Sequence, residues 1–437
     1  MKNSASECFA DERSREPAPP RWVTRLPRAF RHRNYRLFFA GQSITLLGAW
    51  VQTVALSWLV YRLTNSVFLL GLVTFVSQAP IFFITPFAGM IADRYDRRSV
   101  FIVTRSLGMI QAAALTLLTL TGHIGINSII FLALMLGIIT AVETPTRQSF
   151  TVELVGREDL RQAIAMNAMM FNIARTIGPA IGGMIVAALG EGLCFLLNTV
   201  SFAAVLTSLW RMQLPARVLA TTSRPWEEFV QGFRYVATHP HIRMVLFLSA
   251  ICSGFGTSYL ALMPAFAQDI MHQGAASLGY LISAFGIGAI SGAILASRIH
   301  ERHIAITPTI MAVLLGVSLI AFAQTRSMLL AMLFVVPTGF GYLGIAVSSN
   351  TQVQALSEDS MLGRAMAFYA MGALGLPPFG ALLLGYVSDL VGVTNAFMFS
   401  GAVCLVAAGI SLMSLRRRGL ASFASVVKTT DSAAVSK

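Results

Sequence analysis

The sequence predicts an all-α integral membrane protein with twelve transmembrane helices arranged as two six-helix bundles. Two observations support this prediction. Of the 437 residues, 55% are hydrophobic and 12% are charged, whereas a soluble domain carries about 25% charged residues. In addition, the chain contains twelve apolar runs of about 20 residues, a length that crosses the hydrocarbon core of a bilayer as a helix.

The twelve predicted spans form two groups of six. The first group comprises 36–61, 68–92, 99–121, 128–150, 163–188 and 193–212. The second group comprises 243–267, 277–299, 305–324, 328–352, 364–387 and 394–415. We therefore predict a disordered tail at 1–34, an N-terminal bundle at 35–212, a central loop at 213–242, a C-terminal bundle at 243–415 and a second tail at 416–437.

The basic residues indicate how the chain is oriented in the membrane. Nine lysines and arginines lie in the first 36 residues, and most of the others lie in turns on the same side, whereas only Arg62 and Arg326 lie on the opposite side. Because basic residues are enriched in cytoplasmic loops, we predict cytoplasmic termini and a multi-pass protein of the cell inner membrane. The net charge of +13 is then an orientation signal, and the expected partners are the lipid bilayer and a small molecule, not nucleic acid.

The central loop contains the segment "RPWEEFVQGFRYV". Its residues Trp226, Phe229, Val230 and Phe233 follow the spacing i, i+3, i+4 and i+7, which predicts a short amphipathic helix on the membrane surface. The loop separates two halves with similar local features, such as "TVELVGREDLRQAIAMN" after the fourth span and "VQALSEDSMLGRAMAFY" after the tenth. An internal duplication of this kind builds a central cavity between halves that can tilt against each other, which is typical of transporters.

The turn between the second and third spans, "GMIADRYDRRSV", resembles the loop signature of the major facilitator superfamily. The matching positions are Gly89, Asp93, Arg94, Arg97 and Arg98. The second half contains a weaker copy, "GAILASRIHER" (292–302). Two further strings, "GQSITLLGAWVQTVALSWLVYRLTNS" (41–66) and "PTRQSF" (145–150), resemble the enterobactin-exporter-like and drug:proton antiporter branch of that superfamily.

The resemblance implies a transporter that works by alternating access, exposing one central cavity to each side of the membrane in turn. It also implies that Asp93 stabilises the conformation closed on the cytoplasmic side, through span eleven and an arginine of span four. Arg147 is the matching candidate for that arginine. The chain departs from the signature at Asp96, which takes the place of a common glycine.

The fifth span carries the string "GPAIGG", which is similar to the signature of exporters in this superfamily. The matching residues are Gly178, Pro179, Gly182 and Gly183. Proline removes a helical hydrogen bond and bends a helix, while glycines let a neighbouring helix approach closely. We therefore expect a hinge that also seals the span against a partner. The alternative is tight packing alone, since glycine and proline are common in transmembrane helices.

Two charges inside predicted spans are candidates for the transport site. Glu143 lies in the cytoplasmic half of span four, and Arg175 lies near the middle of span five. An ionisable residue at such a position costs about 2.5–3.5 kcal/mol on insertion scales, so it is rarely without function. We expect Glu143 to be the proton-coupling acid and Arg175 to shape the cavity or its charge, with an ion pair between them as one possibility. The alternatives are a static buried pair or a charge that reaches the membrane surface.

The sequence does not favour an enzyme. The seven histidines lie in the tail, in loops or at span ends, and the chain contains no HExxH, GxSxG or P-loop motif. We expect no cofactor and no metal, an ion gradient as the driving force, and a monomer. The expected function is proton-coupled efflux of a small organic molecule, drug or siderophore-like. The alternatives are an uptake or lipid-type transporter of the same fold, a non-transporting membrane sensor and a membrane-embedded enzyme.

Overall fold

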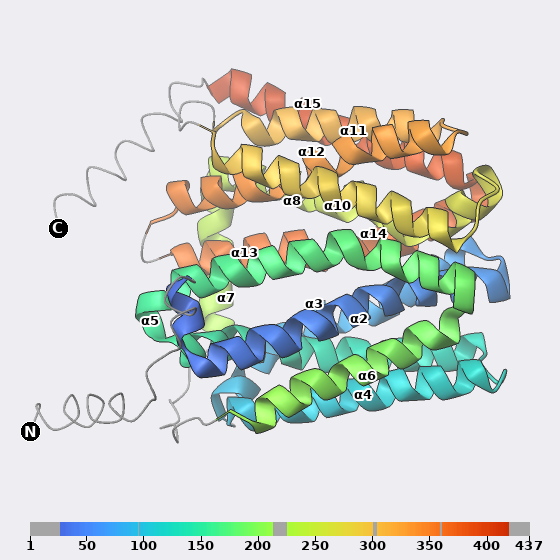
Figure 1. The fold of residues 1–437 in the computed structure, drawn as a ribbon. Coiled ribbons are helices and arrows are strands. Elements are labelled where there is room, and N and C mark those ends of the chain that lie inside the picture. Colours follow the sequence, from blue (N-terminus) through green and yellow to red (C-terminus); the bar gives the residue numbers. More distant parts are fainter. Residues whose placement is uncertain (1–26, 95, 213–224, 300–303, 359–360, 419–437) are drawn as a thin grey trace, which may run out of the picture.

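The computed structural model describes residues 27–94, 96–212, 225–299, 304–358 and 361–418. Within these ranges, the side chains of 85–94, 157, 225–229 and 418 lie outside the description. Most of both predicted tails therefore lies outside the described residues, but residues 27–34 of the first tail are described and form a 3-10 turn and the start of a helix. All regular elements of the described residues are helices (Figure 1), in agreement with the all-α prediction.

The first half of the chain forms five long helices after a short 3-10 turn. They are η2 (Arg28–Arg31), α2 (Arg33–Thr64), α3 (Val67–Arg94), α4 (Arg97–Leu120), α5 (Ile126–Leu189) and α6 (Glu191–Trp210). Helix α5 contains both the fourth and the fifth predicted spans. Only Gly156, with φ of 69°, has non-helical backbone angles inside it. Since L-residues other than glycine rarely adopt this left-handed conformation, Gly156 allows the two spans to form a tight helical hairpin.

The second half of the chain forms shorter and more often interrupted helices. They are α7 (Pro225–Thr238), α8 (Pro240–Gly256), η3 (Ser258–Leu262), α9 (Met263–Ala265), η4 (Phe266–Ile270), α10 (Ala275–Ser297), α11 (Thr307–Ala323), α12 (Met328–Leu356), α13 (Leu362–Gly375), α14 (Pro377–Val391) and α15 (Val393–Arg418).

Two predicted spans of the second half are interrupted. The seventh continues beyond α8 through short 3-10 and π-type turns to Ile270. The eleventh is divided between α13 and α14 at Leu376, directly before Pro377 and Pro378. Proline is favoured in the first turn of a helix and disfavours the helical conformation of the residue before it, so the proline pair starts a new helix here.

The helices have the length and the surface of membrane spans. Eleven segments of the described residues are long and apolar enough to cross a bilayer, and α11 is an apolar helix of 17 residues. Many large apolar side chains on these helices remain exposed in the isolated chain, among them Leu117, Phe131, Leu329 and Val406. Such a surface is costly in water and is stable in lipid. The predicted class, a multi-pass helical membrane protein, is confirmed.

The helices of the two halves lie side by side as two groups (Figure 1). The groups meet where α5 packs on α10 and where α3 packs on α14. Helix α2 begins and α15 ends at the same end of the molecule, on the left in Figure 1. We call this end the terminal face, and the other end, where α5 meets α6 near Gly190, the opposite face.

Small residues let the two groups approach closely between the middle of the spans and the opposite face. A methyl group added at Gly183 of α5 would lie 2.5 Å from the carbonyl oxygen of Ala275 and 3.0 Å from Cα of Gly279, both of α10. At mid-depth, a methyl group on Gly286 would lie 2.9 Å from Cα of Thr176. Close backbone packing of this kind is typical of membrane helices. It closes the interface at the opposite face.

Helix α7 lies inside the interval predicted as the central loop. Gly232 allows it to approach Arg364 and Phe368 of α13, and the rings of Phe233 and Phe368 have centroids 6.2 Å apart. Tyr235 is 8% exposed, and its hydroxyl accepts a hydrogen bond of 3.1 Å from the backbone amide of Glu358. One face of α7 therefore packs on the second group of helices.

Candidate functional site

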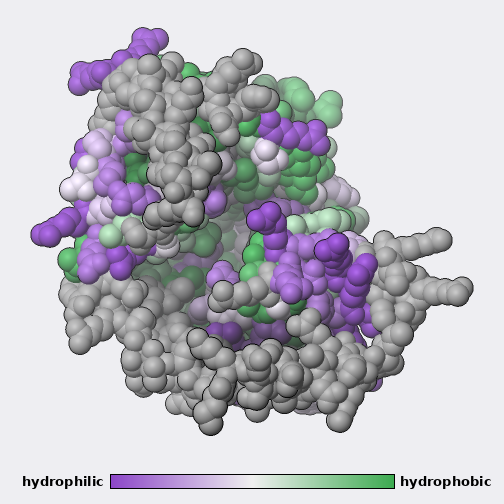
Figure 2. All heavy atoms as spheres, turned by 90° about the vertical axis from the view of Figure 1, so that its left-hand side faces the viewer, coloured by the Kyte–Doolittle hydropathy of each residue, from purple (hydrophilic) through white to green (hydrophobic). Residues whose placement is uncertain are grey.

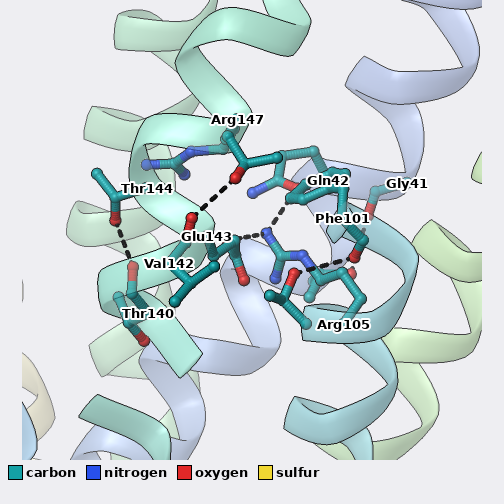
Figure 3. Close-up of polar contacts among 12 residues, drawn as sticks. Gly41, Gln42, Phe101, Arg105, Thr140, Val142, Glu143, Thr144 and Arg147 are labelled. Carbon is teal, nitrogen blue, oxygen red and sulfur yellow. Dashed lines mark hydrogen bonds and ion pairs between the residues drawn. The ribbon is translucent and has the colours of Figure 1, made fainter. Parts of the chain in front are cut away.

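A buried ion pair lies inside the first group of helices. The Arg105 guanidinium of α4 donates to Oε1 of Glu143 on α5 at 2.6 Å and to Oε1 of Gln42 on α2 at 3.0 Å (Figure 3). The side chains of Arg105 and Glu143 are 8% and 13% exposed. Three helices thus bring their polar groups to one depth, closer to the terminal face than to the opposite face.

Aromatic rings make the buried cation of Arg105 tolerable. Its guanidinium carbon lies 5.0 Å from the ring centroid of Phe101 and 5.8 Å from that of Phe202. The face of an aromatic ring attracts a cation, and this attraction strengthens when water is excluded. Arg147, one turn of α5 beyond Glu143, adds a second positive charge that repels Arg105. The cluster therefore has two cations and one carboxylate.

A cavity of about 480 Å³ adjoins this cluster between α2 and the two arms of α5. Its polar lining residues are Gln42, Arg147, Gln148, Thr151 and Asn167. These residues lie in the part of each helix near the terminal face, and Figure 2 shows hydrophilic residues around a recess at that face. Gln42 belongs to both features, because it accepts from Arg105 and lines the cavity.

Arg175 lies apart from this cluster. It is in the middle of the second arm of α5, where its guanidinium donates to Oδ1 of Asn172 at 3.1 Å and interacts electrostatically with Tyr342 of α12. Its Nε atom is buried and has no hydrogen-bond partner among the described residues. The structure therefore pairs Glu143 with Arg105, and it does not bring Glu143 and Arg175 together.

The predicted gating loop is described in part. Gly89, Asp93 and Arg94 belong to the end of α3 whose side chains lie outside the described residues. Arg97 donates to the backbone carbonyl of Ser149 on α5 at 3.2 Å. Arg98 donates to two carbonyls at the end of α6, at 3.1 and 3.2 Å. Both arginines thus connect this loop by hydrogen bonds to neighbouring helices of the same group.

Asp96, where the chain departs from the loop signature, caps the N-terminus of α4. Its carboxylate accepts from the amide of Ser99 at 2.8 Å and from the hydroxyl of Ser99 at 2.6 Å. Partial burial alone would raise the pKa of Asp96, but these hydrogen bonds and the positive charge of Arg98 outweigh it and hold the pKa below its usual value. The unusual residue has a clear structural role as a helix cap.

The glycines predicted in the fifth span pack against two different helices. Added methyl groups would lie 2.6 Å from Cβ of Trp50 at Gly178 and 3.0 Å from Cα of Val51 at Gly182, both on α2 of the same group. Gly183 instead faces α10 of the other group. Helix α5 has helical backbone angles at Pro179. In this conformation, residues 178–183 pack closely on α2 and on α10, and the helix continues without a break through Pro179.

A contact near the opposite face joins the two groups of helices. The hydroxyl of Tyr61 on α2 donates to Oδ2 of Asp269 on η4, and Asp389 of α14 is close enough to interact electrostatically with Tyr61. The next residue, Arg62, forms a 2.8 Å ion pair with Glu191 inside the first group.

Sequence reasoning did not identify the roles of Tyr61, Asp269 and Arg105. Asp269 lies two residues beyond the predicted end of the seventh span, and Arg105 lies inside the third predicted span. A charge in or beside an apolar run was the available signal for both.

The comparisons with known proteins agree with this architecture. The family described as transmembrane secretion effector matches residues 27–430. The staphyloferrin A transporter of Staphylococcus aureus is 26% identical over 380 residues, covering 85% of this chain and 94% of that protein. The enterobactin exporter EntS of Shigella boydii serotype 4 is 26% identical over 400 residues, covering 90% of this chain and 94% of that protein.

Solved structures show the same fold at low sequence identity. A POT family transporter in complex with 5-aminolevulinic acid is 15% identical, with a TM-score of 0.71, over 90% of this chain and 98% of that chain. A bacterial homologue of the human lysosomal transporter Spinster, in an inward-facing and unoccupied conformation, is 15% identical, with a TM-score of 0.63, over 91% of this chain and 97% of that chain.

The family and these relatives are transporters, not enzymes, and the helical architecture agrees with theirs. By name, one relative is a transporter of staphyloferrin A and another is an exporter of enterobactin. This chain is a membrane transporter that belongs to the transmembrane secretion effector family of the major facilitator superfamily.

Proposed function

We propose that this transporter exports a small organic molecule, siderophore-like or drug-like, in exchange for protons. It works by alternating access in the cell inner membrane, with both termini in the cytoplasm. The observation that supports this most strongly is the buried pair of Arg105 and Glu143 beside a cavity near the terminal face. The arginines and lysines concentrated toward the terminal face support its cytoplasmic placement.

In the proposed mechanism, Glu143 carries the coupling proton. In this conformation the carboxylate accepts from Arg105 at 2.6 Å, and loss of that hydrogen bond would free it to bind a proton. A substrate in the cavity that binds Gln42 competes with Arg105 for the same amide oxygen. Substrate and proton then affect each other's binding, and by linkage the effect is reciprocal.

The predicted loop and span-five residues, together with the contact near the opposite face, act as gates in this proposal. The packing of Gly183 on α10 and the bond between Tyr61 and Asp269 hold the opposite face closed while the cavity loads at the terminal face. Movement of the groups about this interface would open that face. The loop with Asp93 and Arg94, together with Arg147, would hold the terminal face closed in the second state. Residues 178–183 of span five, including Pro179, would form the contact surface along which the two groups of helices move.

The relatives support the substrate class and the direction. One is named as a staphyloferrin A transporter and another as an enterobactin exporter, and the family is described by secretion. We therefore favour siderophore-like molecules and efflux over the other possibilities, which are drug efflux, uptake and lipid transport.

The test is transport by the full chain in proteoliposomes with an imposed pH gradient and radiolabelled siderophores. We expect gradient-driven transport that a protonophore abolishes. In Glu143→Gln, gradient-driven transport should fall at least tenfold while exchange of substrate without a gradient persists, because the variant retains the cavity but carries no coupling proton. Glu358→Gln, an exposed acid at the terminal face, is the matched control. Full gradient-driven transport by Glu143→Gln would exclude the proposed role.

A further inference from the structure

Arg175 is a cation within the membrane-spanning part of the chain, and no carboxylate of the described residues pairs with it. Among the described residues, its only hydrogen-bond partner is Asn172, three residues earlier on the same helix. Its Nε is buried and has no hydrogen-bond partner among the described residues, as is also the case for Nε of Arg105. A guanidinium that is removed from water without an anion or a full set of acceptors is strongly disfavoured. Arg175 is partly buried, and what it lacks among the described residues is a carboxylate.

Arg105 shows how this chain satisfies a buried arginine that has a structural partner. It has a carboxylate at 2.6 Å, an amide oxygen at 3.0 Å and two aromatic rings. Arg62, whose side chain is 53% exposed, also has a carboxylate, that of Glu191. No carboxylate of the described residues lies within ion-pair distance of Arg175, and Glu143 is already occupied by Arg105. Arg175 thus differs from both of the other arginines.

The surroundings of Arg175 place it between the two groups of helices. Its neighbour Thr176 contacts Gly286 of α10. Its electrostatic partner Tyr342 belongs to α12 and packs on the ring of Phe285, with centroids 6.0 Å apart. The Tyr342 hydroxyl can donate one hydrogen bond. The contact of Thr176 with Gly286 and the packing of Tyr342 on Phe285 thus place a cation and a hydroxyl donor from opposite groups in the same region at mid-depth.

We propose that Arg175 and Tyr342 form the binding site for a carboxylate group of the transported molecule. The guanidinium donates two parallel hydrogen bonds to the carboxylate oxygens, the geometry that arginine favours, and the Tyr342 hydroxyl donates a third. The bound anion supplies the missing counter-ion and bridges the two groups of helices. This inference rests on the proposed transport function and names the chemical class of its substrate.

The test uses two molecules that differ in charge and little in shape, biphenyl-4-carboxylate and biphenyl-4-carboxamide. Their binding to the purified full chain is measured by calorimetry at pH 7. We expect the wild-type chain to bind the carboxylate at least tenfold more tightly than the amide. In Arg175→Gln this preference should disappear, in Arg175→Lys it should persist in part because a charge without the planar fork remains, and in Tyr342→Phe it should weaken. Arg161→Gln, on the same arm of α5 but exposed, is the matched control and should bind as wild type does.

Three results would overturn the inference. They are equal binding of the two compounds by the wild-type chain, an unchanged preference in Arg175→Gln, and binding of chloride alone with the affinity of the carboxylate, which would indicate a simple inorganic anion site. Failure of the proposed function is distinguishable. A carboxylate preference that depends on Arg175 without any gradient-driven transport would leave this site standing and exclude proton-coupled export. Proton-coupled transport together with unchanged binding in Arg175→Gln would support the proposed function and exclude this carboxylate site.

Discussion

Glu143 and Arg105 hold opposite charges 2.6 Å apart inside a bundle of apolar helices, so each residue depends on the other. Removing one member of a buried pair leaves an uncompensated charge, which is far more costly than replacing both members by apolar groups of similar size. The pair is therefore both a candidate coupling device and a constraint on stability.

This dependence predicts an asymmetric pattern of stability. Arg105→Met should destabilise the folded chain by about 3–5 kcal/mol because Glu143 is left buried and unpaired. The double variant Arg105→Met with Glu143→Met should recover most of that loss. Thermal unfolding in detergent, followed by tryptophan fluorescence, measures both effects. A double variant no more stable than Arg105→Met would contradict the reasoning.

Counting along the sequence placed Glu143 and Arg175 inside their spans but did not identify their partners. Depth in the membrane can be counted from the end of an apolar run, since each residue of a helix rises 1.5 Å. The direction of a side chain around the helix depends on how neighbouring helices pack, and periodicity is weak in spans that are apolar on all sides. For this reason the sequence suggested Arg175 as a partner of Glu143, whereas the structure pairs Glu143 with Arg105.

At the scale of elements, the contact between α5 and α10 depends on the absence of side chains. Gly183 approaches the backbone of Ala275 and Gly279 so closely that even one methyl group would collide with them. Backbone atoms cannot move aside as a flexible side chain does, so the two helices must separate to accept a larger residue.

We therefore expect Gly183→Ala to widen the opposite face. Spin labels at Leu189→Cys and Gln273→Cys, both exposed beside this contact, should report a longer distance by double electron–electron resonance in a background without native cysteines. Gly125→Ala is the control, because a methyl group at Gly125 meets nothing within 4 Å. An unchanged distance distribution in Gly183→Ala would show that the helices tolerate the added group.

The spans themselves were predictable because length and apolarity identify a membrane helix. The interruptions within the spans were harder to predict. The break at Leu376 follows from the proline pair after it, but the 3-10 and π-type turns from Ser258 to Ile270 have no comparable signal in the sequence. They follow from packing: Tyr259, Leu262, Met263 and Phe266 in these turns are fully buried. Between spans four and five, where the sequence left a polar interval, the chain is helical on both sides of Gly156.

At the scale of the whole molecule, the bond between Tyr61 and Asp269 is a direct hydrogen bond from one group of helices to the other near the opposite face. A hydrogen bond to a charged group contributes about 1.5–3 kcal/mol. A contribution of this size is enough to change the ratio of two conformations by at least tenfold. The contact is therefore a candidate for setting which face is open at rest.

Tyr61→Phe should shift the population toward the state open at the opposite face, since the ring remains and only the donor is lost. The measurement is the distance distribution of the same spin-label pair, and Asp269→Asn should give a smaller shift because its amide oxygen still accepts from Tyr61. Arg62→Gln is the matched control, because the pair of Arg62 with Glu191 lies within one group. Equal effects of Tyr61→Phe and Arg62→Gln would indicate a general loss of stability at this end.

The hairpin formed by α5 has a mechanical consequence. Its two arms are joined with Gly156 as the only residue outside helical geometry, so neither arm can slide lengthwise past the other without breaking helical turns. Glu143 lies on the first arm, and Arg175 and Gly183 lie on the second. Because no flexible loop separates the arms, we expect a displacement at the ion pair on the first arm to move the second arm as well, and with it the proposed anion site and the interface at Gly183.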